Sequence, residues 1–182
     1  MDREKKPAIF LDRDGVIIVE KNFLKDPEEI EFYPGAIEAL KAIGDEYIKI
    51  VISNQSGVAR GYFTSADVEK INTHISSILK MSGISIDAWY FCPHGPDDNC
   101  QCRKPRPGMI MKAEEKFNIN IPNSWIIGDK STDIEAGKAA GINTILVKTG
   151  YGGSEPGASD IASDYLASDI GEAIKYINGS IQ

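Results

Sequence analysis

The chain has 182 residues, of which 42% are hydrophobic and 26% are charged, with a formal net charge of -7. These values are ordinary for a globular protein and exclude the disordered and collagen-like classes. The length suits one domain over residues 1–182 that buries a sizeable core without a disulfide scaffold or an oligomeric partner. The acidic balance argues against a general nucleic-acid-binding protein, because such proteins carry a basic surface.

The sequence also predicts where the protein works. No apolar stretch approaches the roughly 20 residues that a membrane span needs, and no signal-type apolar region follows the charged start. Three cysteines, Cys92, Cys100 and Cys102, cannot all pair with one another. A reducing compartment would keep them as thiols that can bind a metal. We therefore expect a cytoplasmic monomer with neither a membrane nor a nucleic-acid partner.

Apolar runs of strand length alternate with segments of helical period, which is typical of a parallel sheet covered by crossover helices. In chain order we expect a strand over 8–12, a helix over 34–44, a strand over 47–53, a helix over 64–81, a strand over 86–91, a helix over 107–117, a strand over 125–129, a helix over 132–141, a strand over 144–148, an edge strand over 164–167 and a helix over 170–177. The first strand is nearly all apolar, so it should be central and covered on both faces. The predicted fold class is doubly wound α/β.

Two carboxylates, Asp12 and Asp14, follow the first predicted strand directly. In open α/β sheets, ligands collect outside the carboxyl ends of the strands. Strand alternation would place residues i and i+2 on the same side, so both carboxylates would converge on one point. The alternative is an ordinary solvated turn, for which Asp and Gly are common.

Groups that suit a phosphate follow two later segments. Ser53 ends the second strand, where its hydroxyl and the next backbone N–H would form a nest for a phosphate oxygen. Arg103, Lys104 and Arg106 stand just before the helix over 107–117, where a phosphoryl group would meet both positive charge and a helix dipole. A plain turn and a solvated basic loop are the alternatives.

Asp129 and Asp133 surround the turn between the fourth strand and the next helix. Asp129 would complete a magnesium site with the first pair of carboxylates, because hard cations prefer oxygen ligands. Asp133 would steady a lysine or a metal-bound water. Capping of the helix by acidic residues is the alternative for both.

In their order and spacing, these four segments resemble the haloacid dehalogenase superfamily. Its pattern is Asp-x-Asp-Gly after the first strand, Ser or Thr after the second, Lys before a later helix and an acidic motif after the fourth. The resemblance implies that Asp12 attacks phosphorus and forms an aspartyl-phosphate, and that Asp14 acts first as general acid and then as general base.

The same resemblance assigns the ligands of the metal and of the phosphate. Mg²⁺ would be held by Asp12, Asp129 and the backbone carbonyl of Asp14, and would offset the repulsion between two anions. Ser53 and Lys104 would bind the phosphate oxygens on which the transition-state charge is spread. Arg13 is expected to point away from the metal.

A second metal site is predicted in the loop over 92–106. Its four candidate ligands are Cys92, His94, Cys100 and Cys102. Thiolate and imidazole are the ligands of tetrahedral structural Zn²⁺, and four of them leave no open position for catalysis. The clustering favours zinc over free thiols or a disulfide. The ion would hold the next residues, which include Lys104, at a fixed distance from Asp12.

A narrower resemblance points to the heptose bisphosphate phosphatases and the related histidinol phosphatases. It rests on the zinc pattern, on Cys-Arg-Lys-Pro-x-Pro-Gly-Met over 102–109 and on Asn-Gln-Ser-Gly-Val-Ala-Arg-Gly over 54–61. The similarity spans 8–152 and implies an open site without a large cap domain. The substrate contacts that it implies are Glu20, Lys21, Asn22, Phe23, Ser53, Asn54, Gln55, Ser56, Arg103, Lys104 and Lys130.

The function expected from the sequence is therefore magnesium-dependent hydrolysis of a small sugar phosphate. The resemblance favours the 7-phosphate of D-glycero-D-manno-heptose 1,7-bisphosphate, with histidinol phosphate as the alternative substrate. A non-catalytic phosphate-receiver module would normally carry an aspartate after a middle strand, where this chain has Ser53. A zinc-dependent nucleic-acid adaptor is disfavoured by the net charge.

Overall fold

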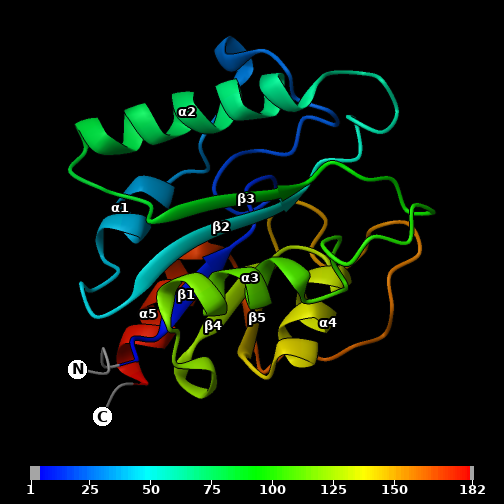
Figure 1. Cartoon of the computed structure of the whole chain (residues 1–182). Helices are drawn as coiled ribbons and strands as arrows, with labels where there is room; N and C mark the ends of the chain where they lie inside the picture. The colour runs from blue at the N-terminus through cyan, green and yellow to red at the C-terminus, as the bar shows by residue number, and fades with distance from the viewer. Residues whose placement is uncertain (1–4, 181–182) are drawn as a thin grey trace.

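Parallel strands form the centre of the molecule, and helices cover both of their faces (Figure 1). The computed structural model describes residues 5–180. The strands are β1 (Ala8–Leu11), β2 (Ile48–Asn54), β3 (Ala88–Cys92), β4 (Trp125–Gly128), β5 (Asn143–Val147) and β6 (Tyr165–Ala167). They form one six-stranded sheet in the order β3-β2-β1-β4-β5-β6, and every neighbouring pair is parallel. The predicted doubly wound α/β fold is confirmed, with β1 at its centre.

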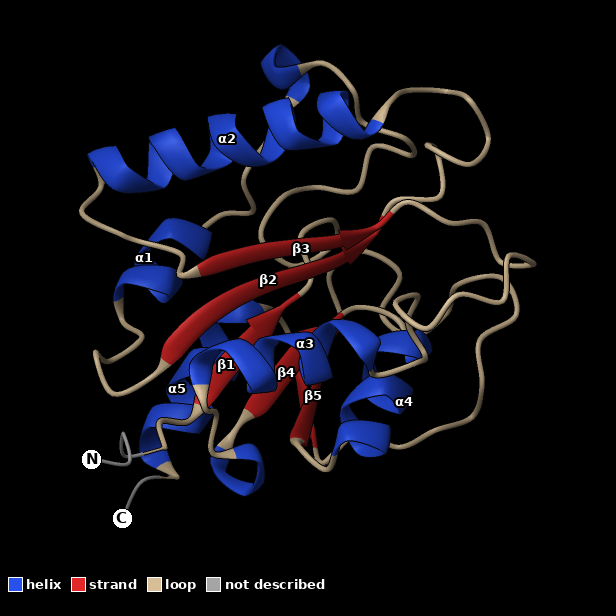
Figure 2. Cartoon of the chain, viewed as in Figure 1, coloured by secondary structure: helices blue, strands red, loops and turns tan. Residues whose placement is uncertain are grey.

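The helices form two layers, one on each face of the sheet (Figure 2). One layer contains α1 (Ala36–Lys41), α2 (Ser65–Met81) and α5 (Ile170–Gly179); the other contains α3 (Gly108–Phe117) and α4 (Ser131–Ala140). Alternate residues of β1 belong to different apolar clusters, with Ile9 facing the first layer and Phe10 the second. A strand that is buried on both faces in this way has a continuous apolar sequence.

Several element boundaries differ from the predicted ones for local reasons. The helix expected over 34–44 is shorter because Gly35 has a φ of +78°, which the inside of a helix does not allow. β3 begins later than expected because the side chain of Asp87 accepts a hydrogen bond from the backbone N–H of Lys49. Thr64 is the N-cap of α2 and forms a capping box with Asp67. Two short 3-10 helices, Pro27–Glu29 and Ile121–Asn123, were not predicted.

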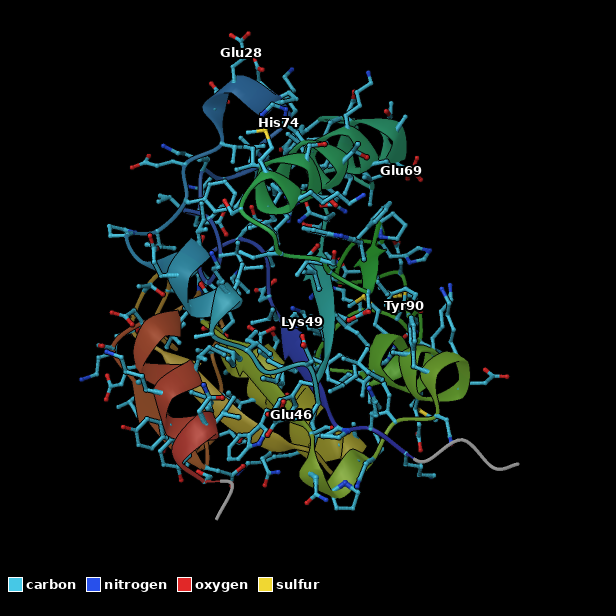
Figure 3. All side chains as sticks on the ribbon, turned by 90° about the vertical axis from the view of Figure 1, so that its left-hand side faces the viewer. Glu28, Glu46, Lys49, Glu69, His74 and Tyr90 are labelled. Atoms are coloured by element: carbon cyan, nitrogen blue, oxygen red, sulfur yellow. The ribbon has the colours of Figure 1, made fainter. Side chains whose placement is uncertain are left out.

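Different parts of the chain lie at the amino-terminal and at the carboxyl-terminal ends of the strands, which are called here the amino-terminal edge and the carboxyl edge of the sheet. Figure 3 views the sheet from its amino-terminal edge, where α5 and α3 flank the strands on opposite sides. Both ends of the described chain lie toward this edge, whereas the long loops gather at the carboxyl edge (Figure 1). Among residues 5–180, single helices and loops connect the strands and no large cap domain is inserted. None of the described helices is long and apolar enough to cross a bilayer.

Candidate active site

Segments that are distant in sequence meet at the carboxyl ends of the three central strands. β1 lies between β2 and β4, so Asp12, Ser53 and Asp129 leave the sheet side by side. The backbone N–H of Asp12 donates to the carbonyl of Ile127 over 3.0 Å, which extends the pairing of β1 and β4 to the first carboxylate. The doubly wound topology therefore brings acids from two strands to one place.

Lys104 brings a buried ammonium group into this cluster. Its Nζ lies 3.2 Å from Oδ1 of Asp12 and 2.5 Å from Oδ1 of Asp133, and it donates to the carbonyl of Ile52 over 3.0 Å. The residue is only 3% exposed. Burial alone would lower the pKa of Lys104, but the charges of Asp12 and Asp133 outweigh it and raise that pKa. Lys104 therefore stays positively charged between two carboxylates.

Asp12, Asp129 and Asp133 form a buried group that suits a cation. One oxygen from each carboxylate lies within 4.8 Å of the others. Asp129 is 0% exposed, and its Oδ1 has no hydrogen-bond partner among the described residues. Burial and the charge of Asp12 raise the pKa of Asp129 to about 9. A divalent cation would relieve this repulsion and give the free oxygen a ligand bond, so the residues fit Mg²⁺.

Two glycines make room for Asp129. Gly15 has a φ of +91° and Gly150 a φ of +61°, and a Cβ atom on either would lie 2.2 Å from Oδ2 of Asp129. Such a distance is far below van der Waals contact, and a side chain would also be strained at these φ values. The glycine of the Asp-x-Asp-Gly motif is thus required by the close approach of the carboxylate from β4.

Asp14 is held by a different set of donors. Its Oδ2 accepts hydrogen bonds from Gln55 Nε2 at 2.9 Å and from Arg13 Nε at 3.0 Å. Arg13 is 1% exposed and donates its other end to Oδ1 of Asn72, on α2, over 3.0 Å. The guanidinium of Arg13 therefore lies against Asp14 and α2, and within the described part of the chain it forms no ion pair or hydrogen bond with Asp12, Asp129 or Asp133.

A cleft of about 330 Å³ opens above these groups. This volume is at the small end of the range for ligand pockets, and it suits a compact polar metabolite. The residues that line it are Asp12, Arg13, Asp14, Glu20, Asn22, Phe23, Leu24, Asn54, Gln55, Ser56, Gly57, Arg60, Arg103, Lys104, Lys130, Thr132, Tyr151, Glu155 and Pro156. Both cations and carboxylates line the cleft, so it can bind an anion and a metal together.

The sequence is similar to known phosphatases over almost its whole length. A HAD-hydrolase-like family model matches residues 101–173. The chain is 38% identical to the D-glycero-beta-D-manno-heptose-1,7-bisphosphate 7-phosphatase of Pasteurella multocida, over 96% of this chain and 98% of that protein. It is 42% identical to the D-glycero-alpha-D-manno-heptose-1,7-bisphosphate 7-phosphatase of Photorhabdus laumondii, over 91% of this chain and 96% of that protein. The chain belongs to the heptose bisphosphate phosphatase family.

The fold supports the same assignment. The crystal structure of D,D-heptose 1,7-bisphosphate phosphatase from B. bronchiseptica, complexed with magnesium and phosphate, superposes with a TM-score of 0.85 and 31% sequence identity. It covers 95% of this chain, which covers 98% of that one. The resemblance to the haloacid dehalogenase superfamily and to this narrower phosphatase family is therefore confirmed.

Most residues for which the family resemblance implies substrate contacts line the cleft, but Lys21 and Ser53 do not. The ammonium of Lys21 pairs with Glu31 over 2.7 Å, outside the cleft. Ser53 is buried, and its Oγ accepts a hydrogen bond from Gln55 Nε2 over 3.2 Å. Gln55 therefore links the hydroxyl at the end of β2 to Asp14.

Asn54 lines the cleft, yet its side-chain amide is already engaged. Its Nδ2 donates to the carbonyl of Lys104 over 3.0 Å, and its Oδ1 accepts from the N–H of Lys104 over 3.1 Å. This pair of bonds resembles one rung of a sheet ladder. The amide of Asn54 thus fixes the backbone that carries the buried Lys104 ammonium.

The sequence did not single out several other lining residues, namely Arg60, Thr132, Tyr151 and Glu155. Two of them, Tyr151 and Glu155, belong to the loop after β5. The available signal was the run Gly150-Tyr151-Gly152-Gly153 directly after a predicted strand, since such loops meet the ligand in this fold. Arg60 lies within the segment over 54–61 that indicated the family, but the sequence of that segment predicts no role for it.

The four predicted ligands in the loop after β3 also meet. Sγ of Cys92 lies 3.6 Å from Sγ of Cys100 and 3.2 Å from Sγ of Cys102, and Nδ1 of His94 lies 3.3 Å from Sγ of Cys102. A tetrahedral ion with bonds of about 2.0–2.3 Å separates its ligands by roughly 3.5–3.8 Å. All three cysteines are free thiols. The set therefore fits a tetrahedral metal such as Zn²⁺.

The loop is tied to the active site by backbone contacts. The N–H of Gln55 donates to the carbonyl of Cys92 over 2.8 Å, and the N–H of Ala59 donates to that of Pro93 over 3.1 Å. Arg103, which lines the cleft, donates to the carbonyl of His94 over 3.2 Å. The conformation of the loop that carries these four candidate ligands thus sets the position of residues on two walls of the cleft.

The crowding at Asp129 gives a test that does not require turnover. Because its folded-state pKa is raised to about 9, the folded metal-free protein holds a proton that the unfolded chain releases above about pH 4. Its free energy of unfolding should therefore fall as pH rises toward 9, by on the order of 1 kcal/mol per pH unit. Asp129→Asn should flatten this slope. Urea unfolding at pH 6 and pH 8, in buffer without added magnesium, measures it.

The matched control is Asp45→Asn, which removes a carboxylate that is exposed to solvent. It should keep the wild-type slope. Added magnesium should raise the stability of the wild type and of Asp45→Asn, but not that of Asp129→Asn, because the cation has lost a ligand. If Asp129→Asn and the wild type show the same dependence of unfolding free energy on pH, the raised pKa of Asp129 is contradicted.

Proposed function

We propose that the protein is a magnesium-dependent phosphatase that removes the 7-phosphate of D-glycero-D-manno-heptose 1,7-bisphosphate and leaves the 1-phosphate. The observation that carries the proposal is the buried group of Asp12, Asp129, Asp133 and Lys104, of which Asp12 and Lys104 line the cleft. The similarity to phosphatases named for this substrate supports the choice among sugar phosphates.

Asp12 is the nucleophile in this proposal. Its Oδ1 accepts from the backbone N–H of Arg13 over 2.8 Å and lies by the Lys104 ammonium, which leaves Oδ2 to attack phosphorus. A bond forms between Oδ2 and phosphorus, and the bond from phosphorus to the sugar oxygen breaks. The leaving oxygen takes its proton from Asp14. Two displacements replace one difficult hydrolysis.

The second displacement regenerates the enzyme. A water attacks the phosphorus of the aspartyl-phosphate and gives its proton to Asp14, which is ready to act as a base once it has protonated the leaving group. The bond between Oδ2 of Asp12 and phosphorus breaks, which restores the carboxylate, and inorganic phosphate leaves with the water oxygen. Gln55 and Arg13 hold Asp14 throughout, so its carboxyl group stays oriented for both proton transfers.

Asp12, Asp129 and the backbone carbonyl of Asp14 would hold the magnesium ion. When bound, the ion neutralises charge on the nucleophile and on the phosphate oxygens. Lys104 supplies a second positive charge beside Asp12, and its ammonium also pairs with Asp133. The proposed role of Ser53 is to donate its hydroxyl hydrogen to a phosphate oxygen, since its Oγ only accepts from Gln55.

The cleft suits a substrate with a second anionic group. It is lined by Arg60, Arg103 and Lys130 as well as by Lys104, in a chain whose net charge is -7. Burial alone would lower the pKa of Lys130, but the charges of Asp12, Asp129 and Glu20 raise it, so the side chain stays an ammonium. Local cations thus attract the bisphosphate against the overall charge.

We further propose that the ligands Cys92, His94, Cys100 and Cys102 hold Zn²⁺ with a structural role. Thiolate ligands of this kind need a reducing compartment, which supports a cytoplasmic location. We also propose that residues 1–182 form one domain that acts as a monomer, because a chain of this length can bury a sizeable core without a partner. Light scattering coupled to gel filtration tests the oligomeric state.

Cys100→Ala tests the zinc site. The variant should lose the bound zinc and about 2 kcal/mol or more of stability, which lowers the midpoint of thermal unfolding by about 4–8 °C in a chain of this size. Elemental analysis and calorimetry measure the two effects. Asp97→Ala, an exposed position of the same loop, is the control and should keep its zinc. Wild-type protein prepared without chelator and free of zinc would refute the site.

Asp12→Asn tests the nucleophile. The amide has the same shape but cannot form the acyl phosphate, so kcat should fall by at least about 1,000-fold. Phosphate release from a generic phosphomonoester measures kcat, and circular dichroism checks the fold. Asp45→Asn serves as the matched control and should retain full activity. Comparable turnover in Asp12→Asn would remove the covalent mechanism.

The substrate is tested by kcat/KM for heptose 1,7-bisphosphate and for histidinol phosphate in the same buffer. We expect a preference of at least about 100-fold for the bisphosphate, because histidinol phosphate would leave cations of the cleft unpaired. Both anomers should be assayed, since the names of the relatives differ in the anomer. A preference for histidinol phosphate would overturn the assigned substrate and leave the phosphatase chemistry standing.

A further inference from the structure

One tyrosine in the loop after β5 contacts three parts of the cleft at once. The backbone N–H of Tyr151 donates to Oδ2 of Asp129 over 2.9 Å, and its hydroxyl donates to Oδ1 of Asn22 over 3.2 Å. Nζ of Lys130 lies 4.9 Å from the centroid of its ring. Tyr151 therefore connects the buried Asp129, the long loop after β1 and Lys130, which lines the cleft.

The loop is held in place without the help of the tyrosine hydroxyl. Thr149 donates from its Oγ1 to the carbonyl of Gly15 over 2.7 Å, and the N–H of Gly153 donates to the carbonyl of Asp129 over 2.7 Å. Gly150 and Gly153 have φ values of +61° and +79°, which a residue with a side chain rarely adopts. These backbone anchors place the ring of Tyr151 at a defined position.

Asn22 has a conformation that needs support from outside. Its φ is +50°, and that of the next residue, Phe23, is +70°, which is uncommon for residues other than glycine. The N–H of Asn22 donates to Oε1 of Glu20 over 2.9 Å. Since Tyr151 occupies the amide oxygen, the two Nδ2 hydrogens of Asn22 are the groups left for a ligand in the cleft that it lines.

Lys130 completes a closed ring of contacts. Its Nζ pairs with Oε2 of Glu20 over 3.4 Å while it lies over the ring of Tyr151. Tyr151, Asn22, Glu20 and Lys130 thus form a continuous network along one wall. Two kinds of donor, an amide and an ammonium, are oriented in it before a ligand arrives, and donors held in advance lose less entropy on binding.

We propose that Tyr151 is a positioning residue that sets selectivity for the end of the substrate remote from the reacting phosphate, by orienting the amide of Asn22 and the ammonium of Lys130. The remote end must then be rich in oxygen and anionic. This inference rests on the proposed function. It concerns binding of the distal group and leaves the transfer of phosphorus to Asp12 untouched.

Tyr151→Phe tests the proposal, because it removes one hydroxyl and keeps the ring beneath Lys130. KM for heptose 1,7-bisphosphate should rise about threefold to tenfold, as expected for one lost hydrogen bond. Its kcat, its unfolding midpoint and its kcat/KM for p-nitrophenyl phosphate, which has no distal phosphate, should match the wild type. Tyr62→Phe is the matched control; Tyr62 is 52% exposed, and among the described residues its hydroxyl makes no hydrogen bond.

A double-mutant cycle with Asn22→Gly identifies the route. Glycine accepts the φ of position 22 without strain, so only the amide is lost. If Tyr151 acts through Asn22, Tyr151→Phe should have no further effect on KM in the Asn22→Gly background. Additive effects in the two variants, or an equal loss on p-nitrophenyl phosphate, would overturn the proposal.

The assay separates the two levels of inference. A wild type that hydrolyses the bisphosphate, with an unchanged KM in Tyr151→Phe, removes the role of Tyr151 and keeps the proposed function. A wild type that hydrolyses p-nitrophenyl phosphate and not the bisphosphate removes both.

Discussion

The site depends on compensating charges that are buried together at one edge of the sheet. Asp12, Asp129 and Asp133 lie close to one another and away from water, where like charges repel strongly. Lys104 offsets part of this repulsion from within the protein, through Asp12 and Asp133. The free oxygen of Asp129 remains, and it creates the need for a metal ion. The repulsion among these carboxylates thus lowers the stability of the protein at the place where a cation and a phosphate would bind.

These buried charges can compensate one another only because the backbone leaves room for the groups to lie close together. Gly15 and Gly150 leave room around Asp129 that any Cβ atom would fill. On the other side, the amide of Asn54 pairs with the backbone of Lys104 and so carries the ammonium to Asp12. Some side chains that the sequence suggests as ligand contacts, such as Asn54, therefore make their hydrogen bonds to other parts of the protein. Their role is to place charge, which the substrate then meets.

The loops around the cleft take the place of a cap domain. The loop after β3 that carries the cysteine and histidine cluster, the long loop after β1 and the loop after β5 each supply part of the wall. Gln55, which follows β2, donates its backbone N–H to Cys92 at the end of β3, and Tyr151 in the loop after β5 donates its hydroxyl to Asn22 in the loop after β1. An open site built in this way can recognise a small substrate by a few oriented donors, without closing over it.

The order of the elements, the fold class and the four motif segments could all be predicted from the amino-acid sequence. These features are local: apolar period, capping residues and short motifs such as the one that starts at Asp12 are visible within a few positions. Tertiary structure decided the rest. The link from Tyr151 to Asn22 spans 129 positions, and the contact between Gly150 and Asp129 depends on two strands lying side by side. Such contacts follow from packing in three dimensions, for which a single sequence carries no periodic signal.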